Sequence, residues 1–246
     1  MTDLLWMPPF DPLTAPPGST NPNYVKEFRG KVLKALDDWV LFDRTAFYAE
    51  GGGQPSDQGK IWWDGGEARV KHVSKKGAVK HVVEGDKIPE GVEVRGVIDW
   101  DLRYKHMRMH TAQHVLSGLA FAMYNAKSAG NQLHADYSRI DLEPPAGVTM
   151  DLSHLEAEVN RVLSEPHPVR TYEEDRKVIE ARDKGRSLMH LVPQSVNRLR
   201  VVEIVDADYC PCAGTHVADT REIGRFKITG TENKGAGKTR IIFELS

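Results

Sequence analysis

Short runs of alternating hydrophobic and polar residues dominate the first part of the chain. They lie at 31–36, 39–42, 59–63, 67–73, 78–83 and 92–98. Turn residues separate them, and the Asp-Gly-Gly turn at 64–66 is typical of a tight hairpin. Many short strands with no helix between them predict a small β-barrel.

The strongest helical pattern of the chain follows at 101–126. Val115, Leu119 and Met123 recur at four-residue intervals, as expected for one face of a helix. The pattern gives way near residues 125–130, where small and polar residues favour a turn. We therefore predict one long helix in the middle of the chain.

The rest of the hydrophobic pattern mixes helices with strands. A helix is predicted after Leu152, where Ser153 and Glu156 have the spacing of a capping box, and a shorter charged helix over 172–182. Strands are predicted at 133–142, 169–172, 199–205, 225–230 and 239–245. Helices combined with mainly antiparallel strands indicate an α+β fold. We expect two domains, an N-terminal β-barrel over residues 1–99 and an α+β domain over 100–246.

Two segments of the N-terminal domain lack a regular pattern. Prolines recur through residues 1–22, which predicts an irregular arm anchored by Trp6 and Phe10. Three successive glycines lie at 51–53, and they are not a phosphate-binding loop because no Gly-Lys-Ser/Thr follows. They fit either a plain turn between strands or a loop that lets a ligand approach the backbone closely.

Composition and charge narrow the class of protein. The 246 residues are 40% hydrophobic and 28% charged, the balance of a soluble globular protein, and the net charge of −2 leaves only local patches for nucleic acid. No apolar run approaches 20 residues and no secretory leader is seen, so we expect a cytoplasmic protein without membrane contact. Cys210 and Cys212 are too close for an unstrained disulfide and are expected to be reduced.

Two histidine-containing motifs carry the candidate chemistry. His110 and His114 are four residues apart, so a helix projects both imidazoles from one face. Cys212 and His216 have the same spacing and add a thiolate and a third imidazole. Either motif alone is common by chance, but together they form a nitrogen and sulfur donor set suited to one tetrahedral zinc ion per chain. Cys210 lies outside this pattern and is not expected to be a ligand.

The motifs together resemble those of a known family. The chain is similar to AlaX, the freestanding alanyl-tRNA editing proteins related to the editing domain of alanyl-tRNA synthetase. The similarity covers most of residues 24–245 and is carried by segments 47–54, 57–59, 108–114, 212–217 and 220–228. The editing domain of threonyl-tRNA synthetase shares the two metal motifs. The glycine-rich segment favours the alanyl branch, in its longer form with an N-terminal barrel.

The resemblance implies a hydrolase that needs no ATP. It would cleave the ester between a wrong amino acid and the 3′ end of tRNA-Ala, with serine as the expected amino acid and glycine as a second candidate. Such editing has a physical basis, because a pocket for alanine discriminates by only about 1–3 kcal/mol against so similar an amino acid. The resemblance makes His110, His114, Cys212 and His216 the zinc ligands. A water activated near zinc is the expected nucleophile, and the sequence identifies no general base.

Candidate contacts to the substrate follow from the same resemblance. Residues expected to border the amino acid or the terminal ribose are Gly51, Gly52, Gly53, Gln54, Thr111, Ser128 and Asn131. Basic residues expected to meet phosphates of the acceptor stem are Arg103, Lys105, Arg108, Lys234, Lys238 and Arg240. Helix and turn structure for the first set, and a solvated charged face for the second, are the alternatives.

Other functions are compatible with the same motifs. A zinc hydrolase acting on another ester or an amide would be distinguished by small amide substrates, although the HxxxH motif lacks the glutamate of HExxH. A non-catalytic RNA-binding module stabilised by zinc would protect charged tRNA instead of discharging it. Editing of another tRNA is a third alternative, which several mischarged tRNAs tested in parallel would separate.

Overall fold

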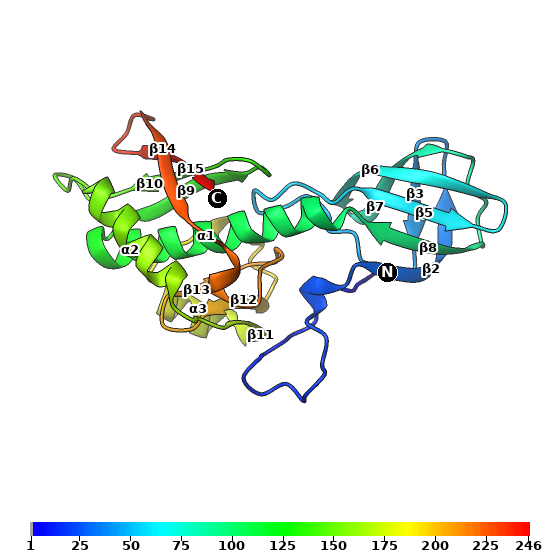
Figure 1. Cartoon of the computed structure of the whole chain (residues 1–246), viewed down its shortest axis with the longest axis horizontal. Coiled ribbons are helices and arrows are strands. Elements are labelled where there is room, and N and C mark those ends of the chain that lie inside the picture. Colours follow the sequence, from blue (N-terminus) through cyan, green and yellow to red (C-terminus); the bar gives the residue numbers. More distant parts are fainter. Residues whose placement is uncertain (1) are drawn as a thin grey trace.

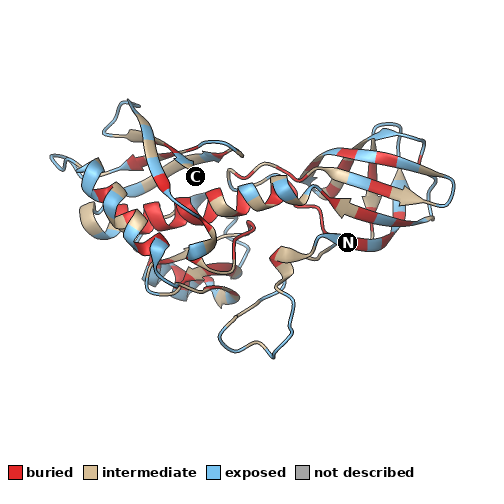
Figure 2. Ribbon diagram, viewed as in Figure 1, coloured by how far each residue is buried: buried red, intermediate tan, exposed pale blue. Residues whose placement is uncertain are grey.

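The protein consists of a barrel at one end and a helix-containing domain at the other, connected by a long helix (Figure 1). The computed structural model describes residues 2–246. Each end has its own hydrophobic core, and buried positions gather inside the barrel and along the central helix (Figure 2). Within the described residues, no helix is both long and apolar enough to cross a membrane.

Six antiparallel strands close the barrel. In spatial order they are β2 (Glu27–Ala35), β3 (Trp39–Phe42), β7 (Ala78–Gly85), β6 (Gly66–Lys76), β5 (Gly59–Trp63) and β8 (Glu93–Ile98). Alternate side chains of β2, including Phe28 and Val32, point inward, as the period of a strand requires. The predicted small β-barrel is confirmed, and the glycine-rich segment lies in the connection between β4 (Arg44–Thr45) and β5.

The proline-rich arm contacts both the N-terminal part of the chain and the α+β part. Its strand β1 (Asp3–Leu4) pairs in parallel with β4 of the N-terminal domain. Farther along the arm, Phe10 exchanges backbone hydrogen bonds of 2.8 and 2.7 Å with Thr171 in the second domain. A short 3-10 helix, η1 (Pro22–Tyr24), then leads into the barrel. The arm therefore fastens the two domains to each other.

Helix α1 (Trp100–Tyr124) is the central element of the second domain. Asp99 caps it, accepting a hydrogen bond from the Leu102 amide at 3.2 Å, and Asn125 ends it in the left-handed conformation with φ 53°. Residues 109–118 are buried without interruption because the helix is covered on several sides. In Figure 1 one sheet lies above α1 and the other below it.

The two sheets of this domain are antiparallel. The first has the order β14 (Phe226–Asn233), β15 (Thr239–Leu245), β10 (Ser138–Glu143) and β9 (Lys127–Leu133), and the second has the order β11 (Val169–Asp175), β12 (Arg198–Ile204) and β13 (Asp208–Pro211). Helix α2 (Leu152–Ser164) packs against α1 and β14, while α3 (Arg176–Asp183), η2 (Met189–Leu191) and η3 (Thr220–Glu222) lie in the connections. The predicted α+β fold is confirmed.

Three local predictions are corrected by the structure. The single strand predicted at 133–142 is two strands, because residues 127–133 form β9, which pairs with β10 where a turn was expected. The charged helix predicted from residue 172 begins only at Arg176, since β11 extends to Asp175. The N-cap of α2 is Asp151, whose side chain accepts from the His154 amide at 3.0 Å, so the predicted capping box is wrong.

Candidate metal centre

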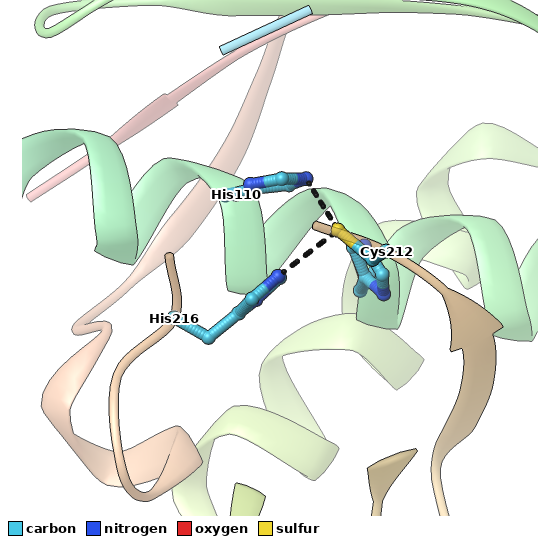
Figure 3. Close-up of side chains that lie close together, drawn as sticks. His110, Cys212 and His216 are labelled. Carbon is cyan, nitrogen blue, oxygen red and sulfur yellow. Dashed lines mark hydrogen bonds between the residues drawn. The ribbon is translucent and has the colours of Figure 1, made fainter. Parts of the chain in front are cut away.

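Four side chains from two distant segments converge beside the middle of α1. His110 and His114 project from successive turns of the helix, Cys212 follows β13, and His216 lies four residues farther along the same loop. The Cys212 Sγ atom lies 3.6 Å from His110 Nε2 and 3.4 Å from His216 Nε2 (Figure 3). The four candidate ligand atoms all lie within 4.8 Å of one another, so this cluster has the geometry to hold a metal ion.

Hydrogen bonds on the outer side of the cluster fix the histidine tautomers. The Asp208 carboxylate accepts from His114 Nδ1 at 2.8 Å. The Thr111 hydroxyl donates to the Met107 carbonyl, so its oxygen is left to accept from His216 Nδ1 at 3.2 Å. In a neutral ring a proton on Nδ1 places the lone pair on Nε2, which is the nitrogen that both rings direct toward the cluster.

Electrostatic interactions inside the cluster favour a thiolate. Burial by itself would raise the pKa of Cys212, but interactions with His110 and His216 lower that pKa well below its ordinary value. Burial lowers the pKa values of His110 and His216, and this effect outweighs the interaction with Cys212 that raises them. Burial opposes protonation of His114, yet its hydrogen bond to Asp208 and the charge of Cys212 raise its pKa to about 9. The cluster thus combines a thiolate with imidazoles, and a metal ion that binds there would displace the extra proton of His114.

The loop that carries Cys212 and His216 is held close to α1. Gly214 permits this approach, because a Cβ atom there would lie 2.2 Å from His110 Cε1. The buried Arg200 side chain donates from Nη1 to the carbonyls of Cys212 and Gly214 at 2.8 and 3.0 Å. The β12 strand therefore fixes the loop from the opposite side.

A cavity of about 360 Å³ opens beside the cluster. His110, His114 and Cys212 form one wall, and the glycine-rich segment and β9 form others. The N-terminal arm also contributes, through Leu4, Trp6 and Met7. Three of the four candidate metal ligands therefore border this cavity.

The predicted substrate residues take different places around this cavity. Gly51, Gly52, Ser128 and Asn131 line it. Asn131 Nδ2 donates to the Gly52 carbonyl at 3.1 Å and to Gln113 Oε1 at 2.7 Å, which ties the glycine-rich segment to α1 and β9. Gly53 is outside the wall, and its carbonyl accepts from the Leu133 amide at 2.8 Å.

Gln54 and Thr111 lie behind the metal ligands instead of facing the cavity. Both side chains are fully buried. The Gln54 amide contacts His110 and Thr215, and the Thr111 hydroxyl contacts His216. Their polar atoms are therefore engaged in supporting the cluster.

The predicted phosphate-binding residues are not equivalent. Arg103 is fully buried in an ion pair with Asp57, so its assignment to tRNA is wrong. Arg108 donates to the Ile223 carbonyl, and Arg240 makes a bidentate pair with Asp141 at 2.7 and 3.0 Å. Lys105 and Lys234 are exposed and Lys238 is half-buried in the β14–β15 turn. These three lysines, together with Arg108 and Arg240, keep the prediction of a phosphate contact.

Asp208, which orients His114, was not among the residues predicted from the sequence. Asp208 is itself buried and paired with Arg186. Burial would raise the pKa of this carboxyl, but Arg186 and His114 hold it below its ordinary value. A carboxylate partner is usual for a metal-ligating histidine, so an acidic residue four positions before Cys212 was a usable signal.

The barrel, the α+β domain and the four-donor cluster beside a cavity together define a class of protein. In this chain an HxxxH pair on a helix and a CxxxH loop supply the four donors, the arrangement expected from the resemblance to the editing domains of tRNA synthetases. The chain belongs to the AlaX family of alanyl-tRNA editing proteins, as its resemblance implied.

The comparisons with known proteins support this membership over nearly the whole chain. The chain is 41% identical to the alanyl-tRNA editing protein AlaX-M of Methanosarcina acetivorans, over 90% of this chain and 95% of that protein. It is 40% identical to the alanine–tRNA ligase of Pyrococcus abyssi, over 89% of this chain and 24% of the ligase. The AlaX-L protein of Pyrococcus horikoshii is 34% identical, over 89% of this chain and 55% of that protein.

Two family profiles match separate parts of the chain. The family described as "Threonyl and Alanyl tRNA synthetase second additional domain" matches residues 199–242, which include Cys212 and His216. The family described as "tRNA synthetases class II (A)" matches residues 22–102, which include the barrel.

Proposed function

We propose that this protein is a trans-editing hydrolase that removes wrong amino acids from tRNA-Ala. The substrate is the ester at the tRNA 3′ end, with serine as the main amino acid and glycine as the second. The observation that carries this proposal is the cavity whose wall includes His110, His114 and Cys212. Membership in a family named for alanyl-tRNA editing supports the substrate class.

Zinc is the metal we propose for the cluster. Ligand atoms of a tetrahedral zinc site with imidazole and thiolate donors lie about 3.3–3.6 Å apart. The 3.4 and 3.6 Å separations from Cys212 Sγ fit this range, and the Nδ1 hydrogen bonds leave Nε2 of His114 and His216 free. His110, His114, Cys212 and His216 would hold the ion, which when bound supplies a Lewis acid beside the ester carbonyl.

Polar groups on the cavity wall would select the amino acid. Ser128 Oγ lies 3.1 Å from Ser117 Oγ, and Asn131 and Gln113 form a second polar pair. A seryl hydroxyl adds a hydrogen-bonding group that these residues can engage. An alanyl methyl group can make no such hydrogen bond, whereas each hydrogen bond gained by a seryl hydroxyl would contribute about 0.5–1.5 kcal/mol. This difference favours hydrolysis of serine over alanine.

The acceptor stem would contact basic side chains at the surface. Lys105, Lys234 and Lys238 keep this role with Arg108 and Arg240, and Lys75 on the cavity wall is an added candidate. Such contacts position the RNA without reading its sequence.

Deacylation of mischarged tRNA tests this function directly. We expect the zinc-loaded protein to release serine from Ser-tRNA-Ala while leaving Ala-tRNA-Ala largely charged. The His110→Ala variant, or removal of zinc with a chelator, should abolish release, and added zinc should restore it to the chelated wild type. Unchanged hydrolysis after complete zinc removal would contradict the role of the metal.

Parallel substrates separate the alternatives. Seryl esters on other tRNAs test the tRNA identity, and small serine amides test a general amidase. Binding of Ser-tRNA-Ala that slows its spontaneous deacylation would contradict editing and indicate a non-catalytic RNA-binding module.

A further inference from the structure

Gln54 links the N-terminal domain to the metal centre of the second domain. It ends the glycine-rich turn, where Gly51 and Gln54 exchange backbone hydrogen bonds of 3.2 and 2.9 Å. Its side chain is fully buried. Oε1 accepts from His110 Nδ1 at 2.9 Å and from the Thr215 amide at 3.0 Å, and Nε2 donates to Thr215 Oγ1 at 2.8 Å.

These contacts determine which atom of the Gln54 amide faces His110. The backbone amide of Thr215 can only donate, so the atom that it contacts must be the carbonyl oxygen. That oxygen can only accept, so His110 Nδ1 must carry the proton in this hydrogen bond. His110 Nε2 is then left with its lone pair directed toward Cys212 Sγ.

The three imidazoles therefore donate their outer hydrogen bonds to acceptors from different parts of the fold. Asp208 and Thr111, which serve His114 and His216, belong to the second domain. Gln54 comes from the N-terminal domain. Asn23 provides a second contact from the N-terminal part of the chain to the metal centre, because its Oδ1 accepts from the His216 backbone amide at 2.7 Å.

We propose that Gln54 is a positioning residue of the metal centre, whose carbonyl oxygen holds His110 in the tautomer and orientation needed to bind the metal. The N-terminal domain thereby completes a site whose ligands all lie in the second domain. This proposal rests on the metal centre of the proposed function, and it is tested by metal binding instead of by hydrolysis.

The test compares two variants, one without and one with a hydrogen-bond acceptor at position 54. Gln54→Leu keeps most of the side-chain volume but removes the acceptor. Gln54→Glu keeps two acceptor oxygens for His110 and Thr215. The control is Gln132→Leu, because Gln132 is exposed and accepts only from Arg139. Zinc affinity is measured on the full-length protein by competition with a chelating dye, and circular dichroism checks that each variant is folded.

We expect Gln54→Leu to weaken zinc binding by about tenfold to a hundredfold, the usual effect of removing an outer partner of a ligating histidine. Gln54→Glu and Gln132→Leu should bind zinc about as tightly as the wild type. In the cobalt-substituted protein, the visible absorption bands should shift in Gln54→Leu and return toward the wild-type spectrum in Gln54→Glu.

Three results would overturn the proposal. Equal zinc affinity and an unchanged cobalt spectrum in Gln54→Leu would show that His110 needs no acceptor from the barrel. Equal loss in Gln54→Glu would show that packing, not hydrogen bonding, is responsible. A wild-type protein that binds no zinc would remove the metal centre itself, whereas zinc binding without hydrolysis of Ser-tRNA-Ala would contradict only the proposed function.

Discussion

Four buried histidines of this protein fall into two groups, according to which atoms their ring nitrogens contact. His110, His114 and His216 each pair Nδ1 with an acceptor and direct Nε2 into the cluster. His81 instead lies in the barrel core, where Nδ1 is 3.3 Å from the Val40 carbonyl and Nε2 is 2.9 Å from the Thr45 hydroxyl. Burial lowers the pKa of His81 from 6.5 to about 3, so this ring is neutral when folded.

His81 is expected to make the fold sensitive to acid. The unfolded chain binds a proton near pH 6.5, but the folded protein resists it down to about pH 3. Stability attributable to this ring is therefore complete above pH 6.5 and is lost as pH falls toward 3, by up to about 1.4 kcal/mol per pH unit.

Denaturant unfolding measures this slope between about pH 4.5 and about pH 6.5. In this range the His81 ring titrates in the unfolded chain but not in the folded protein. We expect His81→Gln to have a shallower dependence of unfolding free energy on pH. The control His154→Gln replaces an exposed histidine and should keep the wild-type slope. Equal slopes in all three proteins would contradict the assignment.

At the scale of elements, the metal centre depends on how closely the β12–β13 turn approaches α1. Gly118 faces this turn, and a Cβ atom there would lie 2.7 Å from the Ala207 carbonyl oxygen and 2.9 Å from Asp208 Oδ1. Because Asp208 orients His114, the absence of a side chain at 118 lets one element support a ligand carried by another.

Gly118→Ala should therefore destabilise the protein although alanine is the better helix former. The propensity gain is about 1 kcal/mol, whereas overpacking against a backbone carbonyl costs about 1–3 kcal/mol. We also expect weaker zinc binding, because the turn moves Asp208 away from His114. Ala122→Gly, at an exposed position of the same helix, calibrates the intrinsic propensity. A Gly118→Ala protein more stable than wild type, with unchanged zinc affinity, would contradict this prediction.

At the scale of the whole molecule, a buried ion pair joins the barrel domain to α1. Arg103 Nε donates to both Asp57 carboxylate oxygens at 2.9 and 3.0 Å, and its other nitrogens donate to the carbonyls of Asn23 and Ala46. Both charged side chains are completely buried. The Asp57 carboxylate also accepts from the Tyr48 amide at 2.8 Å, next to the glycine-rich segment.

Replacing one residue of the Arg103–Asp57 pair should lower the free energy of unfolding more than replacing both residues. Asp57→Ala leaves a buried guanidinium without its counter-charge, so we expect a loss of about 3–5 kcal/mol in unfolding free energy. The double variant Asp57→Ala with Arg103→Met should recover part of this loss. Breaking the exposed Arg95–Glu27 pair with Glu27→Ala should cost less than about 1 kcal/mol. Similar losses for Asp57→Ala and Glu27→Ala in urea unfolding would contradict the importance of this link.

Several features of this protein follow from the sequence alone. The alternating runs determined the barrel strands, because a strand with one buried face must alternate. The four-residue spacing of His110 and His114 determined a shared helix face, because a helix turns once in 3.6 residues. The same spacing in Cys212 and His216 identified the remaining donors, and the combined motifs pointed to the family before any geometry was known.

Only the tertiary structure decided which polar residues serve which site. Arg103 looks like a surface cation in sequence, yet the barrel covers it and Asp57 neutralises it. Gln54, Thr111 and Asp208 each support a different imidazole. Along the chain they lie 56, 105 and 94 residues from His110, His216 and His114, respectively. Local patterns report the period of an element, whereas hydrogen-bond partners depend on how distant elements pack. Sequence therefore determined the ligands, and packing decided how they are held.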